Sequence, residues 1–173
     1  AGFSITPDTS HDDDLRTEAV ALAAHAAATG ASAVLFLGLP AVDESEGFDR
    51  TTLDLPANQV RLLKEVAAVN PRVIVVLSNG GAVSVAPWAE HAPAILEGWL
   101  GGQAGGSAAV DVLLGSAAPS GKLAETIPLR LADTPSFTSF PGENGVVRYG
   151  EGIFVGYRWY DAREIPVAFP FGH

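Results

Sequence analysis

Residues 32–39, which read SAVLFLGL, decide the fold class of this chain. The run is apolar over most of its length, shows no alternation of apolar and polar residues, and is ended by Gly38 and Pro40. A short apolar run of this kind is typical of a strand that is covered on both faces. It therefore predicts a buried strand of a parallel sheet.

Helical and strand patterns alternate on both sides of this run. Apolar residues recur at helical spacing in two longer segments, and other short apolar runs are bounded by Gly, Pro and Asn. We expect helices over 15–28, 56–69 and 107–114, and further strands over 72–78, 92–99 and 122–127. This order predicts an α/β fold, a mainly parallel, flavodoxin-like sheet sandwiched between helices.

The chain has the length of one ordinary domain, so we expect a single α/β sandwich domain over residues 1–173. We expect residues 1–127 to form the alternating β/α core of this domain. Residues 128–173 hold five of the twelve prolines and no clean helical period, which indicates a loop-rich closing segment with one strand near 153–160. Because the chain opens on Ala1, we expect it to be a fragment of a larger protein.

The composition excludes several kinds of partner. A net charge of −10 repels nucleic acid and anionic membranes. There is no cysteine, and the four histidines share no metal-ligand spacing, so we predict neither a metal nor another cofactor. The sequence GGQAGG at 101–106 lacks the dinucleotide-binding pattern and a Walker lysine, so we interpret it as a packing turn.

The loop at 43–50, DESEGFDR, places five charged residues in eight positions directly after the strand at 32–39. In parallel sheets, ligands gather at the carboxyl ends of the strands. Gly47 permits a sharp turn behind Glu46, and the neighbouring Phe48 and Glu44 could raise the pKa of a carboxyl group for acid/base work. The spacing alone favours the simpler interpretation, a solvated, charged turn.

Several stretches together resemble glycoside hydrolase family 3, the β-glucosidases and β-xylosidases. SEGFDRTTLDLPANQVRLL at 45–63 is similar to the acid/base loop of the second domain of that family. NPRVIVVLSNGGAV at 70–83 resembles the strand and turn that follow the loop. Other similar stretches come later in the family's order, at 95–128, 146–161 and 166–173.

The resemblance implies the second domain of a retaining β-glycosidase that hydrolyses terminal, non-reducing β-linked sugars. Glu46 would be the general acid/base, and the residues that shape its loop, candidates for substrate binding, would be Glu44, Ser45, Asp49 and Arg50. The nucleophilic aspartate would lie on an N-terminal barrel domain of the same enzyme. The implied partners are therefore that barrel and a β-linked glucoside or oligosaccharide, and this chain alone would be inactive.

Two alternatives remain at this point. The chain could be a stand-alone flavodoxin-like module that binds a small molecule or docks a partner at its strand ends. Within the glycosidase hypothesis, another carboxylate such as Glu44 or Glu143 could be the acid/base.

Overall fold

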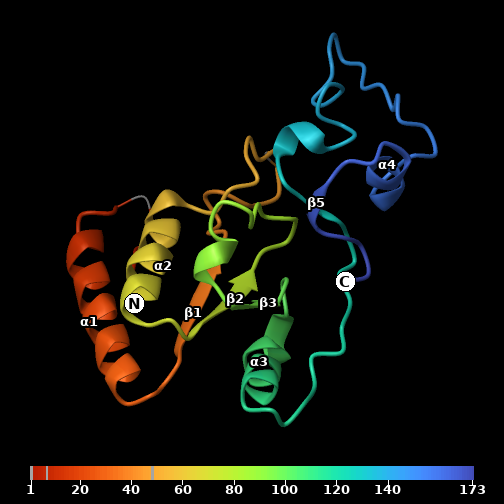
Figure 1. Ribbon diagram of the computed structural model, residues 1–173. Helices are drawn as coiled ribbons and strands as arrows, with labels where there is room; N and C mark the ends of the chain where they lie inside the picture. Colours follow the sequence, from red (N-terminus) through yellow and green to blue (C-terminus); the bar gives the residue numbers. More distant parts are fainter. Residues whose placement is uncertain (1, 7, 48) are drawn as a thin grey trace. The chain divides into compact units, whose positions relative to one another are not determined.

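The computed structural model describes residues 2–6, 8–47 and 49–173 (Figure 1). Contacts divide the chain into two compact units. The first comprises Ala1–Gly81 and Pro87–Pro119, and the second comprises Ala82–Ala86 and Ser120–His173. None of the helices formed by the described residues is long and apolar enough to cross a membrane.

The first unit contains a three-stranded parallel sheet in the order β1-β2-β3. Its strands are β1 (Ala33–Gly38), β2 (Val73–Ser78) and β3 (Ala94–Glu97). Strand β2 lies in the middle and is rich in β-branched residues, which suit a strand with neighbours on both sides. The predicted mainly parallel α/β sheet is confirmed, and each strand lies inside its predicted range.

Helices α1 (Asp12–Ala28) and α2 (Ala57–Val69) pack on each other and on β1. Figure 1 shows them side by side next to the sheet. Three aspartates in the first turn of α1 complement the helix dipole, and α2 follows directly after Pro56. A third helix, α3 (Gly105–Leu113), follows β3 and the short 3-10 helix Gly102–Ala104.

The core of the first unit lies between these helices and the sheet. Leu63 and Val75 are fully buried, and their neighbours on α2 and β2 are nearly so. The apolar core residues with the least exposure in the strands and in α2 are Leu37, Leu62, Leu63, Val66, Val73, Val75 and Leu77.

Strand β1 departs from its prediction on one face. Leu37 is buried, but Val34 and Phe36 are 38% and 61% exposed, so the expected burial on both faces is wrong. Alternate residues of a strand point to opposite faces. Helices α1 and α2 pack on β1, and its two exposed side chains share one face, so β1 is an apolar run with one open face.

The Gln59 side chain closes the end of β1. Its Oε1 accepts a hydrogen bond from the Gly38 N–H at 2.9 Å, and its Nε2 donates to the Gly38 carbonyl at 2.7 Å. Gln59 is 2% exposed, and its two hydrogen bonds satisfy both backbone groups of Gly38 on this edge strand. Helix α2 thereby fixes Gly38, the last residue of β1 before the chain leaves the sheet.

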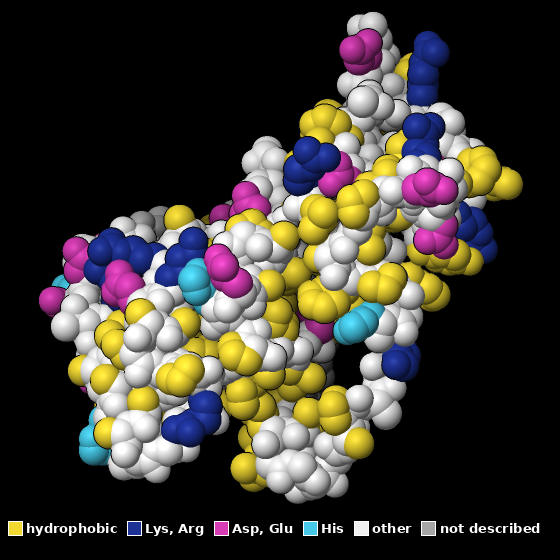
Figure 2. Space-filling model, in the orientation of Figure 1, with side chains coloured by type: hydrophobic (Ala, Val, Ile, Leu, Met, Phe, Trp, Pro, Cys, Tyr) yellow, Lys and Arg dark blue, Asp and Glu magenta, His cyan; other side chains and the backbone are white. Residues whose placement is uncertain are grey.

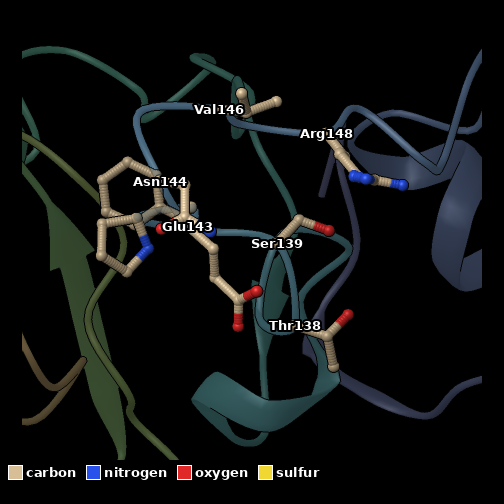
Figure 3. Close-up of a pocket in the computed structure, with 9 residues that line it drawn as sticks. Thr138, Ser139, Glu143, Asn144, Val146 and Arg148 are labelled. Atoms are coloured by element: carbon tan, nitrogen blue, oxygen red, sulfur yellow. The ribbon is translucent and has the colours of Figure 1, made fainter.

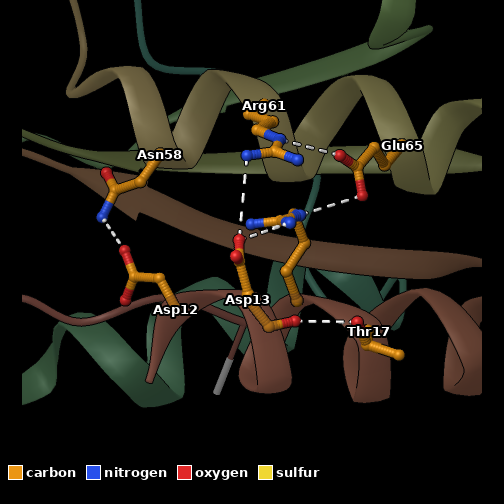
Figure 4. Close-up of polar contacts among 7 residues, drawn as sticks. Asp12, Asp13, Thr17, Asn58, Arg61 and Glu65 are labelled. Atoms are coloured by element: carbon orange, nitrogen blue, oxygen red, sulfur yellow. Dashed lines mark hydrogen bonds and ion pairs between the residues drawn. The ribbon is translucent and has the colours of Figure 1, made fainter. Parts of the chain in front are cut away.

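Polar contacts also join α1 to α2 (Figure 4). Asp12 accepts hydrogen bonds from the Asn58 side chain at 2.8 Å and from the Ser4 N–H at 2.7 Å. The hydrogen bond from Asn58, followed by the bond from Ser4 and the charge of Arg16, holds the pKa of Asp12 below its ordinary value. Asp12 therefore remains ionised to a lower pH in the folded chain than in the unfolded chain.

A cluster of acidic and basic side chains lies beside Asp12 and Asn58, also between α1 and α2. Arg16 contacts Asp13 at 2.7 Å and Glu65 at 3.0 Å, and Arg61 contacts the same Glu65 at 3.0 Å. Figure 4 shows the acidic and basic side chains alternating between the two helices. A network of this kind holds the helices in one register more firmly than an isolated exposed pair would.

We expect Asp12→Asn to lower stability in a pH-dependent way. A carboxyl group whose folded-state pKa is depressed stabilises the fold above its unfolded pKa of about 3.9, and that stability is lost as the pH falls through the folded-state value. The difference in the free energy of unfolding between parent and variant should be largest near pH 7 and should become smaller below about pH 4. Urea unfolding at several pH values measures it.

The matched control is Asp14→Asn, which removes the same charge from the same helical turn but from an exposed position. If the two variants differed in their free energy of unfolding by the same amount at pH 7 and at pH 3, the proposed stabilising role of the ionised Asp12 would be wrong.

The second unit contains a two-stranded antiparallel sheet, β4 (Ile127–Pro128) and β5 (Val167–Phe169). It also contains the 3-10 helix Leu131–Asp133 and the short helix α4 (Tyr157–Ala162). The Trp159 indole donates to the carbonyl of Asp133 at 3.0 Å, which ties these two helices together.

Two strand predictions in this region are wrong. Over 122–127 only Ile127 enters a regular strand, because its partner segment carries Pro170, which has no N–H, and Gly172 in a left-handed conformation (φ +80°). The predicted strand at 153–160 ends in a helix instead. Gly156 at φ +55° turns the chain immediately before α4, so Tyr157 and Trp159 do not share a strand face.

Large apolar side chains also lie at the surface, where Figure 2 shows hydrophobic groups in yellow. In the second unit, Tyr149 and Ile153 are 80% and 78% exposed. They belong to a run over 146–155 whose large apolar members are all exposed: Val146, Val147, Tyr149, Ile153, Phe154 and Val155. A run of exposed apolar side chains of this kind is typical of an interaction surface.

Candidate active-site loop

The loop at 43–50 leaves the carboxyl end of β1, as predicted. The Leu39 N–H donates to the Ser78 carbonyl at 3.1 Å, so the pairing of β1 with β2 continues one residue past β1 itself. The N–H groups of Asp43 and Glu44 then both donate to the Pro40 carbonyl, at 2.8 and 3.0 Å. A tight turn therefore starts the loop at the sheet edge where parallel folds bind ligands.

Glu44 points back to the neighbouring strand end. Its Oε2 accepts a hydrogen bond from the Gly80 N–H at 2.6 Å, and its Oε1 accepts one from the Gly81 N–H at 3.0 Å. Arg50 Nη1 lies 3.6 Å from the same Oε1. Two successive backbone N–H groups form a small anion-binding concavity, and here the loop's own carboxylate occupies it.

Glu46 lies two residues further along and is exposed. Within the described part of the chain, its carboxylate makes no hydrogen bond or ion pair. Gly47 behind it has φ +97°, a conformation that favours glycine, which accounts for the glycine expected at this turn. Phe48, which was expected to lie near Glu46, is outside the described residues.

The other predicted loop residues differ in environment. Ser45 and Asp49 are exposed, whereas Arg50 has a side-chain exposure of 17% and pairs with Glu44. Asp49 and Arg50 also line a hollow of about 480 Å³ beside the start of α2. Of the two glutamates in the loop, Glu44 therefore points inward and Glu46 is exposed.

The sequence reasoning did not predict the roles of the Gly80–Gly81 turn and of Asn79 in holding this loop. The signal for them is SNGG at 78–81, which follows the neighbouring parallel strand and therefore ends at the same sheet edge. Asn79 is fully buried, and its Nδ2 donates to the Gly81 carbonyl at 2.9 Å.

Glu143, the other candidate carboxylate, lies in the second unit on a tight hairpin. Its N–H and carbonyl both pair with Val146, at 3.0 and 2.9 Å, around Asn144 and Gly145 in left-handed conformations. Figure 3 shows the Glu143 side chain directed toward Thr138 in a hollow of about 480 Å³. Glu143 is exposed and lies at a hairpin, not at the carboxyl end of a parallel strand.

The sequence model of the glycosyl hydrolase family 3 C-terminal domain matches residues 5–157. The chain belongs to this family. The match confirms the resemblance seen in the loop and in the later stretches, and it confirms the α/β fold expected for the second domain of family 3.

Known family 3 proteins resemble the chain over nearly its whole length. It is 56% identical over 162 residues to the exo-alpha-(1->6)-L-arabinopyranosidase of Bifidobacterium breve, covering 94% of the chain and 21% of that protein. It is 50% identical over 162 residues to the thermostable beta-glucosidase B of Acetivibrio thermocellus, with the same coverage of both. The chain therefore spans about a fifth of the length of these curated relatives.

A solved structure shows the same arrangement of the chain. The crystal structure of the Bifidobacterium adolescentis GH3 beta-glucosidase matches with a TM-score of 0.93 and 54% identity, over 99% of this chain and 25% of that one. The family 3 relatives are glycoside hydrolases in which this domain accompanies a much longer remainder.

Proposed function

We propose that this chain is the second domain of a retaining β-glycosidase and supplies Glu46 as the general acid/base. The observation that supports this role is the exposed Glu46 carboxylate on a loop at the carboxyl end of β1. A catalytic acid/base must reach a substrate outside its own domain when the nucleophile lies on another. Glu44 and Glu143 fit less well, because Glu44 accepts two backbone hydrogen bonds and Glu143 lies on a hairpin.

The proposed chemistry has two steps. In the first, the protonated Glu46 carboxyl donates its proton to the glycosidic oxygen as the bond to the anomeric carbon breaks, while a nucleophilic carboxylate forms a covalent glycosyl-enzyme. In the second, the Glu46 carboxylate removes a proton from a water molecule, which attacks the anomeric carbon and releases the nucleophile. Glu46 is protonated again when the cycle ends.

The nucleophile is proposed to be an aspartate on a barrel domain of the same enzyme. Retaining glycosidases hold their two carboxyl groups about 5–5.5 Å apart, so the two domains must meet at the loop that carries Glu46. The relatives contain four to five times the length of this chain, which leaves room for such a domain. The exposed apolar run over 146–155 is also consistent with a surface that another domain covers.

The proposed substrate is a glycoside with a terminal, non-reducing β-linked sugar. Several relatives are named as β-glucosidases, which favours β-glucosides. The most similar of the relatives named above is an arabinopyranosidase, which favours terminal α-L-arabinopyranosides as the second candidate. Both kinds of sugar can present an equatorial glycosidic bond, so the same acid/base could serve either.

The experiment compares the isolated chain with the full-length protein that contains it, on aryl β-D-glucosides and aryl α-L-arabinopyranosides. We expect the full-length protein to hydrolyse at least one of these with retention of configuration, which proton NMR of the first-formed sugar reports. The isolated chain should release no sugar above background, because the covalent step requires the nucleophile.

Hydrolysis by the isolated chain, or inversion by the full-length protein, would contradict the proposal. Micromolar binding of a nucleotide or flavin by the isolated chain, together with an inactive full-length protein, would favour the stand-alone binding module instead.

A further inference from the structure

We infer that Glu44 is a positioning residue that fixes the loop carrying Glu46 to the turn after β2. The inference rests on the proposed function and assigns Glu44 a role that the acid/base hypothesis leaves open. Both oxygens of its carboxylate are engaged, Oε2 by the Gly80 N–H at 2.6 Å and Oε1 by the Gly81 N–H at 3.0 Å. Hydrogen bonds from N–H groups to a charged acceptor are about twice as strong as neutral ones.

The turn that receives Glu44 is itself held in place. Asn79 is fully buried and donates to the Gly81 carbonyl at 2.9 Å, with Glu97 Oε2 at 3.5 Å from the same nitrogen. Glu97 in turn accepts a hydrogen bond from the Trp99 N–H at 3.0 Å, just beyond β3. Glu44 therefore binds a turn that is tied to the end of the next strand.

Glu44 also brings the two ends of the catalytic segment together. Arg50 Nη1 lies 3.6 Å from Glu44 Oε1, and both side chains are partly buried, with exposures of 17% and 22%. The segment 44–50 is therefore closed by contacts that meet at one carboxylate. Glu46 lies inside this closed segment, two residues from the anchor, so its Cα stays within about 7 Å of the Glu44 Cα.

Glu44 leaves little space for a side chain at one of the two glycines of the turn. A Cβ built at Gly80 would lie 3.3 Å from both Cδ and Oε2 of Glu44, closer than most Cβ contacts. A Cβ at Gly81 would lie at ordinary contact distances, 3.8 Å from Glu44 Oε1. Neither glycine has a left-handed φ, so alanine fits the backbone at both positions. The Cβ at Gly80 presses on Glu44 and also lies 3.3 Å from Leu100 Cδ1, whereas the Cβ at Gly81 presses on neither.

A general acid works only within hydrogen-bond distance of the oxygen that it protonates, and a displacement of about 1 Å can cost about 10²-fold in rate. Loss of the anchor should therefore act through Glu46. This predicts a pattern that a general loss of folding would not produce: the rate should fall most on the substrates that need acid catalysis most.

The test uses Glu44→Ala, Glu46→Ala and the double variant in the full-length protein. We expect Glu44→Ala to lower kcat/KM on glycosides with poor leaving groups by about 10- to 100-fold and on activated aryl glycosides by much less. The double variant should match Glu46→Ala within about threefold, because the anchor has no effect once the group that it positions is gone. Glu18→Gln, an exposed change on α1, controls for loss of a carboxylate and should leave the rates unchanged.

A second pair of variants changes the two glycines whose N–H groups donate to Glu44. Gly80→Ala should reproduce the leaving-group pattern of Glu44→Ala more weakly, and Gly81→Ala should have the smaller effect of the two. Hydrogen–deuterium exchange in the full-length protein should show faster exchange over 43–50 and at residues 80 and 81 in Glu44→Ala.

The inference is overturned if Glu44→Ala lowers kcat/KM equally on all substrates, or if it leaves kcat/KM unchanged. It is also overturned if the double variant shows the product of the two single-variant losses. Failure of the proposed function has a different signature, in which Glu46→Ala itself leaves every rate unchanged. In that case the proposed catalytic role of Glu44 is also wrong. Hydrogen–deuterium exchange over 43–50 then reports only whether Glu44 holds the loop to the turn at 80 and 81.

Discussion

Replacing Glu46 with alanine in the full-length protein is expected to slow hydrolysis of glycosides with poor leaving groups by about 10²–10⁴-fold. The reason is that such leaving groups depart only when their oxygen is protonated, and alanine has no proton to give. The aryl groups of activated glycosides leave as stable phenolate anions without being protonated, so the rate of the first step should fall less on these substrates. Steady-state kinetics on a series of aryl glycosides measures this difference.

Added azide should restore turnover of Glu46→Ala on activated substrates. Azide is a strong nucleophile that needs no general base, so it can attack the glycosyl-enzyme where water no longer can. The product should be a glycosyl azide with retained configuration. Its formation, detected by NMR or mass spectrometry, would separate loss of acid/base function from loss of folding.

Glu143→Ala is the matched control for this prediction, since Glu143 is also an exposed glutamate in a loop. We expect it to leave the leaving-group dependence and the azide response unchanged. If Glu46→Ala were as active as the parent on every substrate, or if Glu143→Ala showed the azide rescue, the acid/base role of Glu46 would have to be withdrawn.

Gly38→Ala is expected to be the most damaging small substitution for stability. A Cβ at Gly38 would overlap the Ser78 carbonyl oxygen on the paired strand and would lie 3.2 Å from the Ser78 Cβ. The backbone cannot move aside easily, because Gln59 binds both the N–H and the carbonyl of Gly38. We expect a loss of about 3 kcal/mol or more in the free energy of unfolding.

Urea unfolding and thermal melting of the chain measure this loss, and the melting temperature should fall by about 6–12 °C. Gly106→Ala is the matched control, because nothing lies within 4 Å of its built Cβ and it is a residue of α3. It should leave stability unchanged or raise it by up to about 1 kcal/mol. Equal effects at the two glycines would contradict the packing described for β1 and β2.

Much of the first unit could be predicted from local patterns. Helix α2 follows the spacing of its apolar residues, and β2 follows from an apolar run between Arg72 and Asn79. These signals are strong because each element has a buried side that its own residues must supply. The parallel order of the strands then follows from the alternation of helix and strand.

The second unit was predicted less well, because its elements depend on distant partners. The run at 153–160 is apolar enough to suggest a strand, yet Gly156 turns the chain and α4 begins at Tyr157. The helix is fixed by contacts such as that of the Trp159 indole with Asp133, 26 residues earlier in the sequence. No pattern within eight residues reports a partner at that distance.

For the candidate site, the sequence by itself determined the loop, its position after a strand and the family to which its motif belongs. The family resemblance implied Glu46 as the acid/base, but residue type and spacing alone do not distinguish it from Glu44, two positions earlier. The tertiary structure shows the physical difference between them. The parallel pairing of Gly38 with Ser78 brings the turn at 80 and 81 beside a loop about 36 residues earlier, and its N–H groups bind the first carboxylate while the second remains exposed.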